Sequence, residues 1–294
     1  MQEPPLLRGR DRYERIMEGW SDDAAGEAFT HTVRLADPDR HVELSVTALP
    51  SPTYAIHAAE CRVLAGDVSP AAVRGVAGLA GSAMVGGLTR RATELTGGGG
   101  GGGRFVVDAL IEVARLSRQV AKLPAELAQQ AGEGSARVCW ELDTAGWIDL
   151  PDSCFTYSAA GRRLLDTCRV TPAMVPQLYR PEPGQRKVFV RKKVARLERR
   201  GPMLELHHSM HDNVHGFDVH YAIDVPTARV IRAEHTTPKL PYMGICSEPQ
   251  RKIAALLGET VDDGLRRRIQ GHLGGAGGCA QLYDLTADLL KLLA

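Results

Sequence analysis

The chain repeats its own pattern, and this repeat constrains the fold more than any other feature of the 294 residues. Residues 41–60 align with residues 216–235 at an offset of 175, and apolar positions then fall on apolar positions. Further along the offset becomes 177, and a glycine-rich break precedes a closing segment in both copies. The matched pairs are Val42 with Phe217, Leu44 with Val219, Val46 with Tyr221, Ile56 with Ile231, Ala58 with Ala233, Val76 with Ile253, Leu79 with Leu256, Gly81 with Gly258, Leu88 with Leu265, Asp108 with Asp284, Val113 with Leu289 and Leu116 with Leu292.

Each copy has the same predicted order of elements: a strand, a hairpin, a strand and then three helices, with the glycine break before the last helix. This order predicts an α+β fold in which an antiparallel sheet is covered on one face by helices. We expect two tandem copies of this unit, packed as a pseudo-dimer. The predicted parts are a degenerate repeat over residues 1–125, a connector over 126–180 and a repeat carrying a His/Cys site over 181–294. Within the connector, ARVCWEL and CFTYS are expected to form short strands.

Charge and cysteine content narrow the classes of function. Lysine and arginine total 36 and aspartate and glutamate total 35, so the formal net charge is +1. This balance argues against obligatory binding to nucleic acid or to a membrane surface, which needs a clustered positive excess. The first residues lack the apolar core of a signal peptide, and six cysteines are too dispersed for a disulfide framework. The sequence therefore predicts a cytoplasmic protein with a small-molecule substrate, and it leaves homo-oligomer formation open.

Five of the ten histidines lie in one stretch, HHSMHDNVHGFDVH, which has the pattern of a hairpin. Asp212-Asn213 is a dipeptide suited to positive φ, so we expect the turn there. Residues then alternate between an apolar face and a face of opposite charges. The expected pairs are Leu204 with Tyr221, Leu206 with Val219, His208 with Phe217 and Met210 with His215 on the apolar face, and Glu205 with His220 and His207 with Asp218 on the other.

This pairing separates the histidines into classes. His207 and His220 are expected to form solvated pairs with acidic neighbours. His208 and His215 face the core near the mouth of the hairpin and are the sharper functional candidates, whereas His211 lies at the turn. The alternative for His208 and His215 is an ordinary core histidine whose hydrogen bonds are satisfied.

Two cysteines precede predicted helices. Cys246 comes directly before Ser247 and Gln250, which have capping-box spacing, and Cys279 follows a glycine break and opens the last helix. The positive end of a helix dipole lowers the pKa of a thiol, and a thiolate is the form that attacks a substrate or ligates a metal. The alternative is plain packing, because free cysteine is often buried. The other four cysteines, namely Cys61, Cys139, Cys154 and Cys168, are read as core residues.

The first copy lacks every one of these candidates. Val33 and Arg40 occupy the positions of His208 and His215. Gly103 occupies that of Cys279, and Ser69 or a neighbour occupies that of Cys246. Packing alone would not predict that the scaffold persists while all the chemically active side chains are confined to one copy. We therefore place the functional site in the second half.

From His215 to Leu292 the chain resembles the bacterial "domain of unknown function 2889" family. The carrying motifs are FDVHYAID, PYMGIC ending at Cys246, the LxG of Leu256–Gly258, and LGGAGGCAQLYDL. The family usually has a histidine where this chain has Gln281, and an aspartate where it has Gly216. A weaker likeness is to iron–sulfur scaffold and sulfur-acceptor proteins of the NifU/SufE type, whose first and last cysteines Cys246 and Cys279 would match. The middle cysteine of that pattern is missing.

Three functional hypotheses follow from these residues. The first is a small-molecule enzyme of lyase or hydrolase type, either metal-dependent or using a thiolate–imidazole pair. The candidate catalytic residues are His215, Cys246, Tyr242 and Asp212, and the candidate metal ligands are His208, His211, His215, Cys246 and Cys279, a set that suits zinc or an iron–sulfur cluster. In this hypothesis Tyr242 and Asp212 transfer protons or contact substrate. The second is an iron–sulfur or sulfur-carrier protein, and the third is an interaction module without chemistry.

Overall fold

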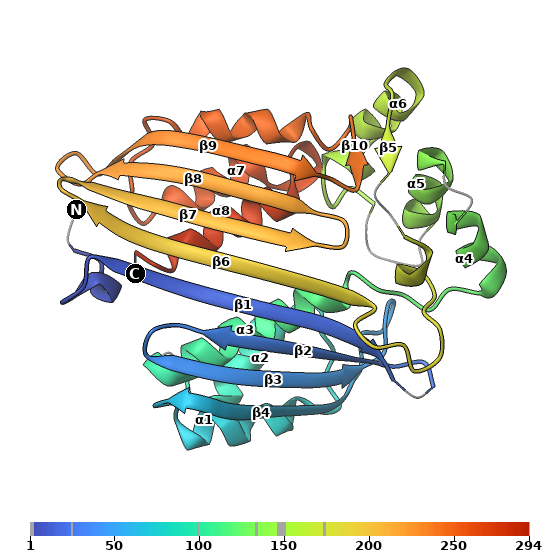
Figure 1. Ribbon diagram of the computed structural model, residues 1–294, viewed down its shortest axis with the longest axis horizontal. Coiled ribbons are helices and arrows are strands. Elements are labelled where there is room, and N and C mark those ends of the chain that lie inside the picture. Colours follow the sequence, from blue (N-terminus) through green and yellow to red (C-terminus); the bar gives the residue numbers. More distant parts are fainter. Residues whose placement is uncertain are drawn as a thin grey trace. The chain divides into compact units, whose positions relative to one another are not determined.

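The computed structural model describes residues 3–24, 26–98, 100–132, 135–145, 151–172 and 175–293. The chain divides into two compact units (Figure 1). The first unit contains residues 16–133 and 175–192, and the second contains residues 1–15, 134–174 and 193–294. Both units combine antiparallel strands with helices, which confirms the predicted α+β class. No helix in the described ranges is long and apolar enough to span a bilayer.

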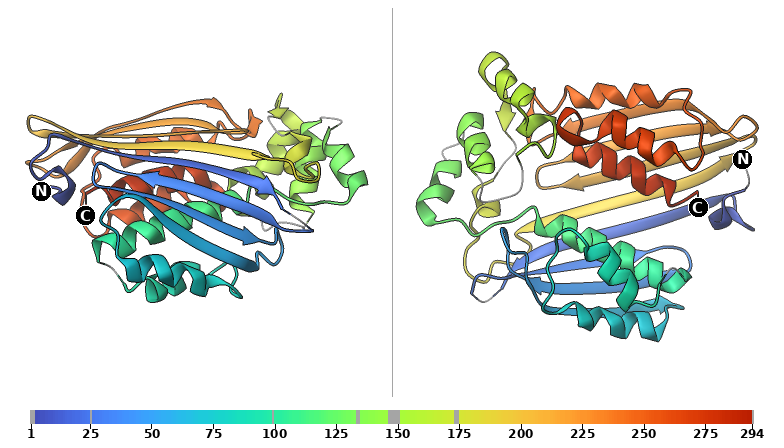
Figure 2. Two further views of the ribbon diagram at one scale, coloured as in Figure 1. Left: turned by 60° about the horizontal axis from the view of Figure 1, so that its bottom comes forward. Right: turned by 180° about the vertical axis from the view of Figure 1, so that it is seen from behind.

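The first unit is built on four strands with helices against one face (Figure 2). The strands lie in the order β4-β3-β2-β1, so each pairs with its neighbour in sequence. Apolar and polar residues alternate along β3, and its apolar side chains are buried beneath the helices. The elements are β1 (Arg12–Asp23, mostly in this unit), β2 (Phe29–Ala36), β3 (Arg40–Ala48), β4 (Ile56–Gly66), α1 (Pro70–Gly75), the 3₁₀ helix η2 (Val76–Leu79), α2 (Leu88–Leu95), α3 (Gly101–Ser117), α4 (Ala125–Gly132) and η4 (Pro176–Leu178).

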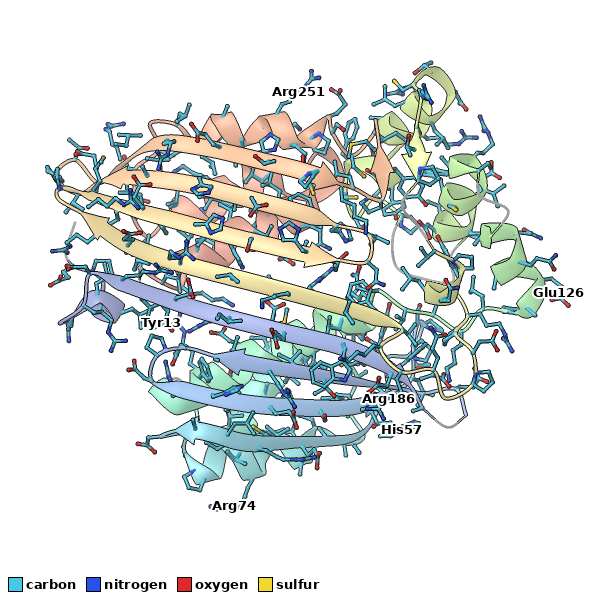
Figure 3. The ribbon with its side chains drawn as sticks, viewed as in Figure 1. Tyr13, His57, Arg74, Glu126, Arg186 and Arg251 are labelled. Carbon is cyan, nitrogen blue, oxygen red and sulfur yellow. The ribbon has the colours of Figure 1, made fainter. Side chains whose placement is uncertain are left out.

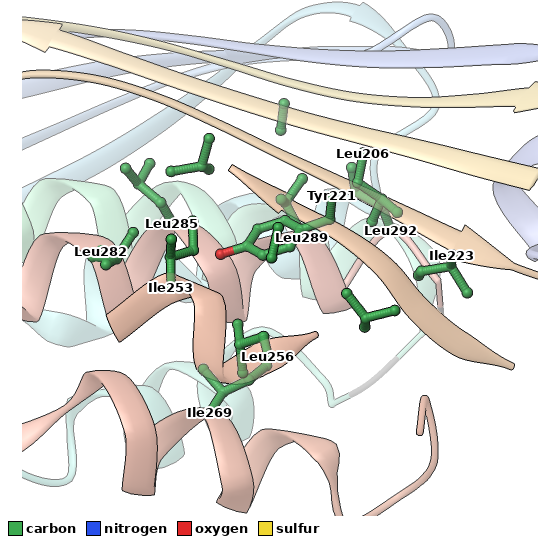
Figure 4. Close-up of a cluster of buried hydrophobic side chains, with 14 of the residues drawn as sticks. Leu206, Tyr221, Ile223, Ile253, Leu256, Ile269, Leu282, Leu285, Leu289 and Leu292 are labelled. Atoms are coloured by element: carbon green, nitrogen blue, oxygen red, sulfur yellow. The ribbon is translucent and has the colours of Figure 1, made fainter. Parts of the chain in front are cut away.

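The second unit repeats this plan, with strand order β6-β7-β8-β9 and helices packed on one face. Its core lies between β7–β9 and the helices, where Leu285 and Leu289 of α8 meet Leu206 and Tyr221 of the strands (Figure 4). The elements are η1 (Pro5–Leu7), α5 (Ala136–Thr144), η3 (Phe155–Tyr157), α6 (Ala159–Thr167), β5 (Thr171–Pro172), β6 (Phe189–Arg200, mostly in this unit), β7 (Met203–Asp212), β8 (Gly216–Asp224), β9 (Arg229–Lys239), β10 (Tyr242–Met243), η5 (Pro249–Leu256), α7 (Leu265–Leu273), η6 (Gly275–Gly277) and α8 (Ala280–Leu290).

The two central hairpins have the same pairing register. Corresponding residues of β2–β3 and β7–β8 differ by 175 in number on both strands. A register shift follows Thr47 in β3, and another follows Ala222 in β8 at the matching place. The corresponding pairs are Val33–Leu44 and Leu35–Val42 in the first unit, and His208–Val219 and Met210–Phe217 in the second.

The fourth strands correspond with an offset one residue smaller than the sequence alignment predicts. The Gly81 N–H donates to the Ile56 carbonyl at 2.9 Å, and the Gly258 N–H donates to the Val230 carbonyl at 2.8 Å. Ile56 and Val230 are buried, whereas Ile231 is 50% exposed. The predicted match of Ile56 with Ile231 is therefore wrong, as is that of Ala58 with Ala233, because the connection between the paired strands is one residue shorter in the second unit.

Beyond the strands, the correspondence continues at the predicted offset of 177. Gly81 and Gly258 both have a φ of +81°, a conformation that strains residues with a side chain. Arg74 of α1 and Arg251 of η5 occupy matching positions, and both side chains project into solvent (Figure 3). Buried residues at this offset are Val76 with Ile253, Leu79 with Leu256, and Leu88 with Leu265.

The connector contains one short strand, β5, but the prediction that ARVCWEL and CFTYS form strands is wrong. ARVCWEL forms helix α5, whose N-cap Ser135 accepts the Val138 N–H at 3.1 Å. The CFTYS segment forms η3, and Ser158 then caps α6 by accepting the Gly161 N–H at 3.3 Å. In α5 a serine cap outweighs the β-propensity of the aromatic and branched residues, whereas η3 forms without a side-chain cap.

Candidate functional site

Residues 135–145 and 151–172 pack against the part of the second unit that contains PYMGIC. Strand β5 pairs with β10, setting Pro172 opposite Tyr242. The Phe155 N–H donates to the Gly278 carbonyl at 2.8 Å. Gly244 has a φ of +108°, and a Cβ there would lie 2.6 Å from the Arg169 carbonyl oxygen, so only glycine fits. The connector is therefore part of this unit's candidate site.

A buried carboxylate with two phenol donors lies at this junction. Asp143, near the end of α5, is only 1% exposed. The Tyr242 hydroxyl donates to its Oδ2 at 2.5 Å and the Tyr157 hydroxyl donates to the same oxygen at 2.9 Å. Tyr242 is fully buried, and Tyr157 is partly exposed. Burying a carboxylate costs free energy unless hydrogen bonds stabilise it, and the two phenols supply such hydrogen bonds to Asp143.

Three thiols surround the same junction. The Cys246 Sγ lies 3.0 Å from the Thr156 Oγ1. Cys154 and Cys279 belong to the same junction, because the Phe155 N–H next to Cys154 donates to the carbonyl of Gly278 next to Cys279. The three residues are of intermediate exposure, and Cys246 and Cys279 pack against the core of the unit. Cys154 is therefore not the fully buried core residue that the sequence predicted.

The thiols are protonated at neutral pH. Burial raises the pKa of Cys154 to about 11 and that of Cys246 to about 12. Cys279 does cap α8, as predicted, and its Sγ accepts the Leu282 N–H at 3.5 Å. Burial nevertheless raises the pKa of Cys279 as well. The predicted thiolate is therefore wrong for the free protein, because desolvation of the charged form outweighs the helix dipole.

The predicted capping box after Cys246 does not form. Helix η5 begins at Pro249 with Glu248 as its N-cap, and no side chain caps it. Gln250 instead turns inward, and its Nε2 donates to the Cys246 carbonyl at 3.0 Å. Gln250 is 1% exposed, and its Oε1 is buried without a hydrogen-bond partner among the described residues. A buried, unpaired carbonyl oxygen beside the thiols is a polar feature that core packing alone does not explain.

The histidine hairpin turns one residue later than predicted. His211 pairs with Gly216, so the turn residues are Asn213 and Val214. His208 consequently faces Val219 and not Phe217, and His207 faces His220 and not Asp218. Moving the turn by one residue changes each pairing partner by two residues, so each side chain stays on its predicted face. Asn213 and Val214 are absent from the positive-φ residues of the described chain, because the Asp212 side chain, rather than a left-handed backbone, closes the turn.

Asp212 also holds His215. Its Oδ1 accepts the His215 backbone N–H at 2.6 Å, and the His215 Nδ1 lies 3.1 Å from both carboxylate oxygens. An Nδ1–H donor here leaves Nε2 as the free nitrogen, and no hydrogen bond to Nε2 exists among the described residues. In the first unit, Asp37 holds Arg40 in the same way, with the Arg40 guanidinium 2.7 Å from Oδ2. His215 thus replaces an arginine in a shared turn.

The other histidines have separate contacts. His208 is 3% exposed, and its Nδ1–H donates to the Leu285 carbonyl of α8 at 2.9 Å. The His211 Nε2 lies 3.2 Å from Asp218, and the His211 side chain is 54% exposed. The described ranges contain no group of three or more His, Cys, Asp or Glu side chains that could hold a metal ion. The structure brings Cys246, Cys279 and Tyr242 to one junction, and Asp212 and His215 to the hairpin tip at the same end of the unit (Figure 1).

Sequence reasoning missed Asp143, Cys154, Thr156 and Tyr157, all from the connector. A signal was present: Ser135 and Ser158 precede helical spacing, so the segment could have been read as capped helices. The carboxylate in α5 and the thiol before η3 would then have been placed on ordered elements. Their contacts with residues about a hundred positions later carry no local sequence signal.

Residues 195–293, about one third of the chain, match the model of a family described as "Protein of unknown function (DUF2889)". This match confirms the resemblance for the C-terminal part of the chain. No curated protein and no solved structure matches the chain. The likeness to NifU/SufE-type proteins stays a prediction. The family description assigns no activity, so function rests on the geometry of the second unit.

Proposed function

We propose that the protein is a small-molecule enzyme of lyase or hydrolase type that uses general acid–base chemistry in its second unit. One observation carries this proposal: the buried Asp143 carboxylate accepts the hydroxyls of the buried Tyr242 and of the partly exposed Tyr157. Titratable groups held together in a desolvated network are typical of active sites. Among its described residues, the first unit has no counterpart of α5, the helix that supplies Asp143.

The residues fit complementary roles. Tyr242 is the proton donor, and Asp143 orients its hydroxyl and takes part in the transfer. His215 is the base, because Asp212 holds Nδ1 and leaves Nε2 for substrate, as carboxylates orient histidine in hydrolases. In the first unit, Arg40 lies 4.5 Å from the ring centre of Phe105, the fifth residue of α3. The corresponding place near His215 is the first turn of α8, which Cys279 caps.

We further propose that the units arose by tandem duplication and that the site belongs to one copy only. The shared register, register shifts and positive-φ glycines support this origin. The predicted pseudo-dimer packing, cytoplasmic location and homo-oligomer formation stay predictions. The nearly balanced charge favours a small-molecule substrate over nucleic acid or a membrane surface.

A sulfur-carrier or iron–sulfur scaffold is the second candidate, and one observation favours it. Cys154 supplies a third thiol beside Cys246 and Cys279, where the sequence comparison lacked a middle cysteine. Against it, the thiols are protonated in the free protein, whereas sulfur transfer needs a thiolate. The enzyme hypothesis therefore leads.

Untargeted mass spectrometry of a cell extract incubated with the full chain tests the enzyme proposal. We expect the wild-type protein to consume one small molecule and form another. Tyr242→Phe and His215→Arg should each slow this conversion by about a hundredfold or more. The arginine variant is the matched choice, because Arg40 shows that arginine satisfies the same turn. An extract left unchanged, or a conversion equally fast in both variants, would refute the proposal.

A further inference from the structure

Strand β4 is the outer strand of the first unit's sheet, and it pairs on one side only, with β3 (Figure 1). After Ile56, its backbone makes no backbone–backbone hydrogen bond outside this pairing among the described residues. An edge strand of this kind presents N–H and C=O groups with which another strand can pair. The edge of β4 is therefore a surface that a further strand can extend.

Strand β9, the outer strand of the second unit, shows how an edge is protected. It contains Pro238, which has no N–H to donate to a partner strand. The Arg232 side chain of β9 is held by Glu205 of β7. In contrast, β4 has neither proline nor lysine in its 11 residues. The two matched edges therefore differ, because the second is protected and the first is not.

The middle of β4 is regular enough to pair with a partner strand. Register shifts in its pairing with β3 leave His57 and Leu64 as bulged residues, and 58–63 pair without interruption between them. A bulge disrupts the pairing and bends the strand, so a partner strand has only this segment to pair with. An interface on this edge is therefore short and centred between the two bulges.

The side chains of this segment divide between two faces. Ala59, Cys61 and Val63 lie opposite buried residues of β3, on the face that the helices cover. Val63 is nevertheless 40% exposed, so the helices leave an apolar side chain uncovered at this edge. Glu60 and Arg62 lie on the other face, where their side chains are 59% and 64% exposed and form an ion pair at 2.8 Å. The edge thus presents an apolar stripe on one face and two opposite charges on the other.

This arrangement is complementary to a second copy of itself. Antiparallel pairing about a two-fold axis at Cys61 sets each Cys61 opposite its mate, and each Ala59 opposite Val63 of the other copy. On the other face it sets Glu60 of each copy opposite Arg62 of the other, twice by symmetry. Opposite charges and apolar side chains directly across an antiparallel pair stabilise it. This register therefore satisfies both faces.

The neighbouring registers do not satisfy both faces. A two-fold axis at Glu60 or at Arg62 sets like charges opposite each other, which destabilises the pairing. An axis at Ala59 or at Val63 leaves both charges opposite uncharged residues. The charge pattern of the strand therefore selects Cys61 as the centre.

We propose that β4 is a homodimer interface and that its partner is a second copy of this chain, paired antiparallel about a two-fold axis at Cys61. Each copy then supplies the strand that the edge of the other lacks. This inference does not depend on the proposed acid–base function, because Asp143, Tyr242 and His215 belong to the other unit. It gives the first unit, which lacks the candidate site, a role in assembly.

Sedimentation of the reduced full chain, over a concentration series reaching about 1 mM, tests the interface. We expect a monomer–dimer equilibrium. Glu60→Arg and Arg62→Glu each set like charges opposite at two places, so each should weaken dimerisation at least about fivefold. The combined variant exchanges the two charges and should restore the wild-type dissociation constant. Arg232→Glu, on the protected edge β9, is the matched control and should dimerise as the wild type does.

Cys61 provides a readout of the register in the wild-type protein. Directly opposite residues have Cα atoms about 4.5–5.5 Å apart, which is within the reach of a disulfide. Oxidation by copper phenanthroline and oxygen should therefore link Cys61 to Cys61 of the second copy, as mass spectrometry of peptides detects. Cys61→Ser should lose this link and still sediment as a dimer. Cys168→Ser, which lacks the exposed thiol, should keep the link.

Three outcomes would overturn the interface: a monomer at every concentration, a dimer that charge reversal leaves unchanged, or oxidation that links Cys168 and not Cys61. Loss of turnover in Tyr242→Phe with normal dimerisation would leave the interface standing. This inference and the proposed function therefore fail separately.

Discussion

The two units have the same strand pairing in their central hairpins, but different residues at matched positions of their cores. Where the first unit has Val33, Val46 and Leu110 in its core, the second has His208, Tyr221 and Thr286. The new polar groups are satisfied within the unit: His208 donates to a helix carbonyl at 2.9 Å, and the Tyr221 and Thr286 hydroxyls lie 2.7 Å apart. The comparison teaches that this scaffold accepts polar core residues when each arrives with a partner.

The hairpin turns lead to a second lesson. Asp37 and Asp212 perform the same structural task in the two units, so the carboxylate alone is no sign of function. What differs is the residue it holds, an arginine in one unit and a histidine in the other. Arginine has a fixed charge, whereas histidine has a second nitrogen that can exchange a proton.

The largest expected effect concerns helix α8. Leu285→Ala places the first unit's residue, Ala109, at a fully buried position of the second. The core there is built around the leucine, so the free energy of unfolding should fall by about 3 kcal/mol. Urea denaturation followed by circular dichroism measures it. A loss below about 1 kcal/mol would mean that the two cores tolerate the same residue and differ less than their contacts indicate.

A second effect concerns acid stability and should amount to about 2 kcal/mol at pH 4.5. Burial lowers the pKa of His31 to about 3, below its ordinary value of 6.5. The unfolded chain therefore binds a proton that the folded chain does not, and stability falls as the pH drops from about 6.5 toward about 3. His31→Leu, which copies Leu206 of the second unit, should remove this part of the loss. Urea denaturation at pH 7 and at pH 4.5 measures the loss of stability in the wild type and in His31→Leu. An equal loss in both proteins would show that His31 is not its cause.

The smallest effect should be equal in the two units. Asp37→Ala and Asp212→Ala each leave turn N–H groups without their acceptor, and each should cost roughly 1.5 kcal/mol of unfolding free energy. Equal costs, measured by the same denaturation, would support one shared turn. If Asp212→Ala were neutral while Asp37→Ala were costly, the carboxylate in the second unit would have been retained for its effect on His215 alone.

Because the sequence repeats, most of the strands in each unit could be predicted from it. Apolar side chains recur with period two in the strands. The matched glycines form the same turn after η2 and after η5, so alignment alone located Gly81 and Gly258. Errors arose where pattern and geometry separate. The hairpin register was wrong by two residues because a period-two pattern is unchanged by that slip. The match of Ile56 was wrong by one because a shortened connection leaves no mark in a short apolar run.

The candidate site was only half predictable. Tyr242, Cys246 and Cys279 lie near recognisable helix starts, whereas Asp143 and Cys154 acquire their meaning from contacts about a hundred residues away. The thiolate prediction failed for an electrostatic reason: a dipole argument from sequence counts the helix but not the desolvation around the sulfur.

The long reach of the Tyr242–Asp143 hydrogen bond, 99 residues in sequence, has a consequence for biosynthesis. At roughly 5–20 residues per second on the ribosome, the aspartate emerges about 5 to 20 seconds before its phenol partner exists. During that interval α5 can contact η3 and α6, which follow it closely in the chain, but not the later Tyr242. The order of translation therefore makes the last quarter of the polypeptide the step that locks this junction.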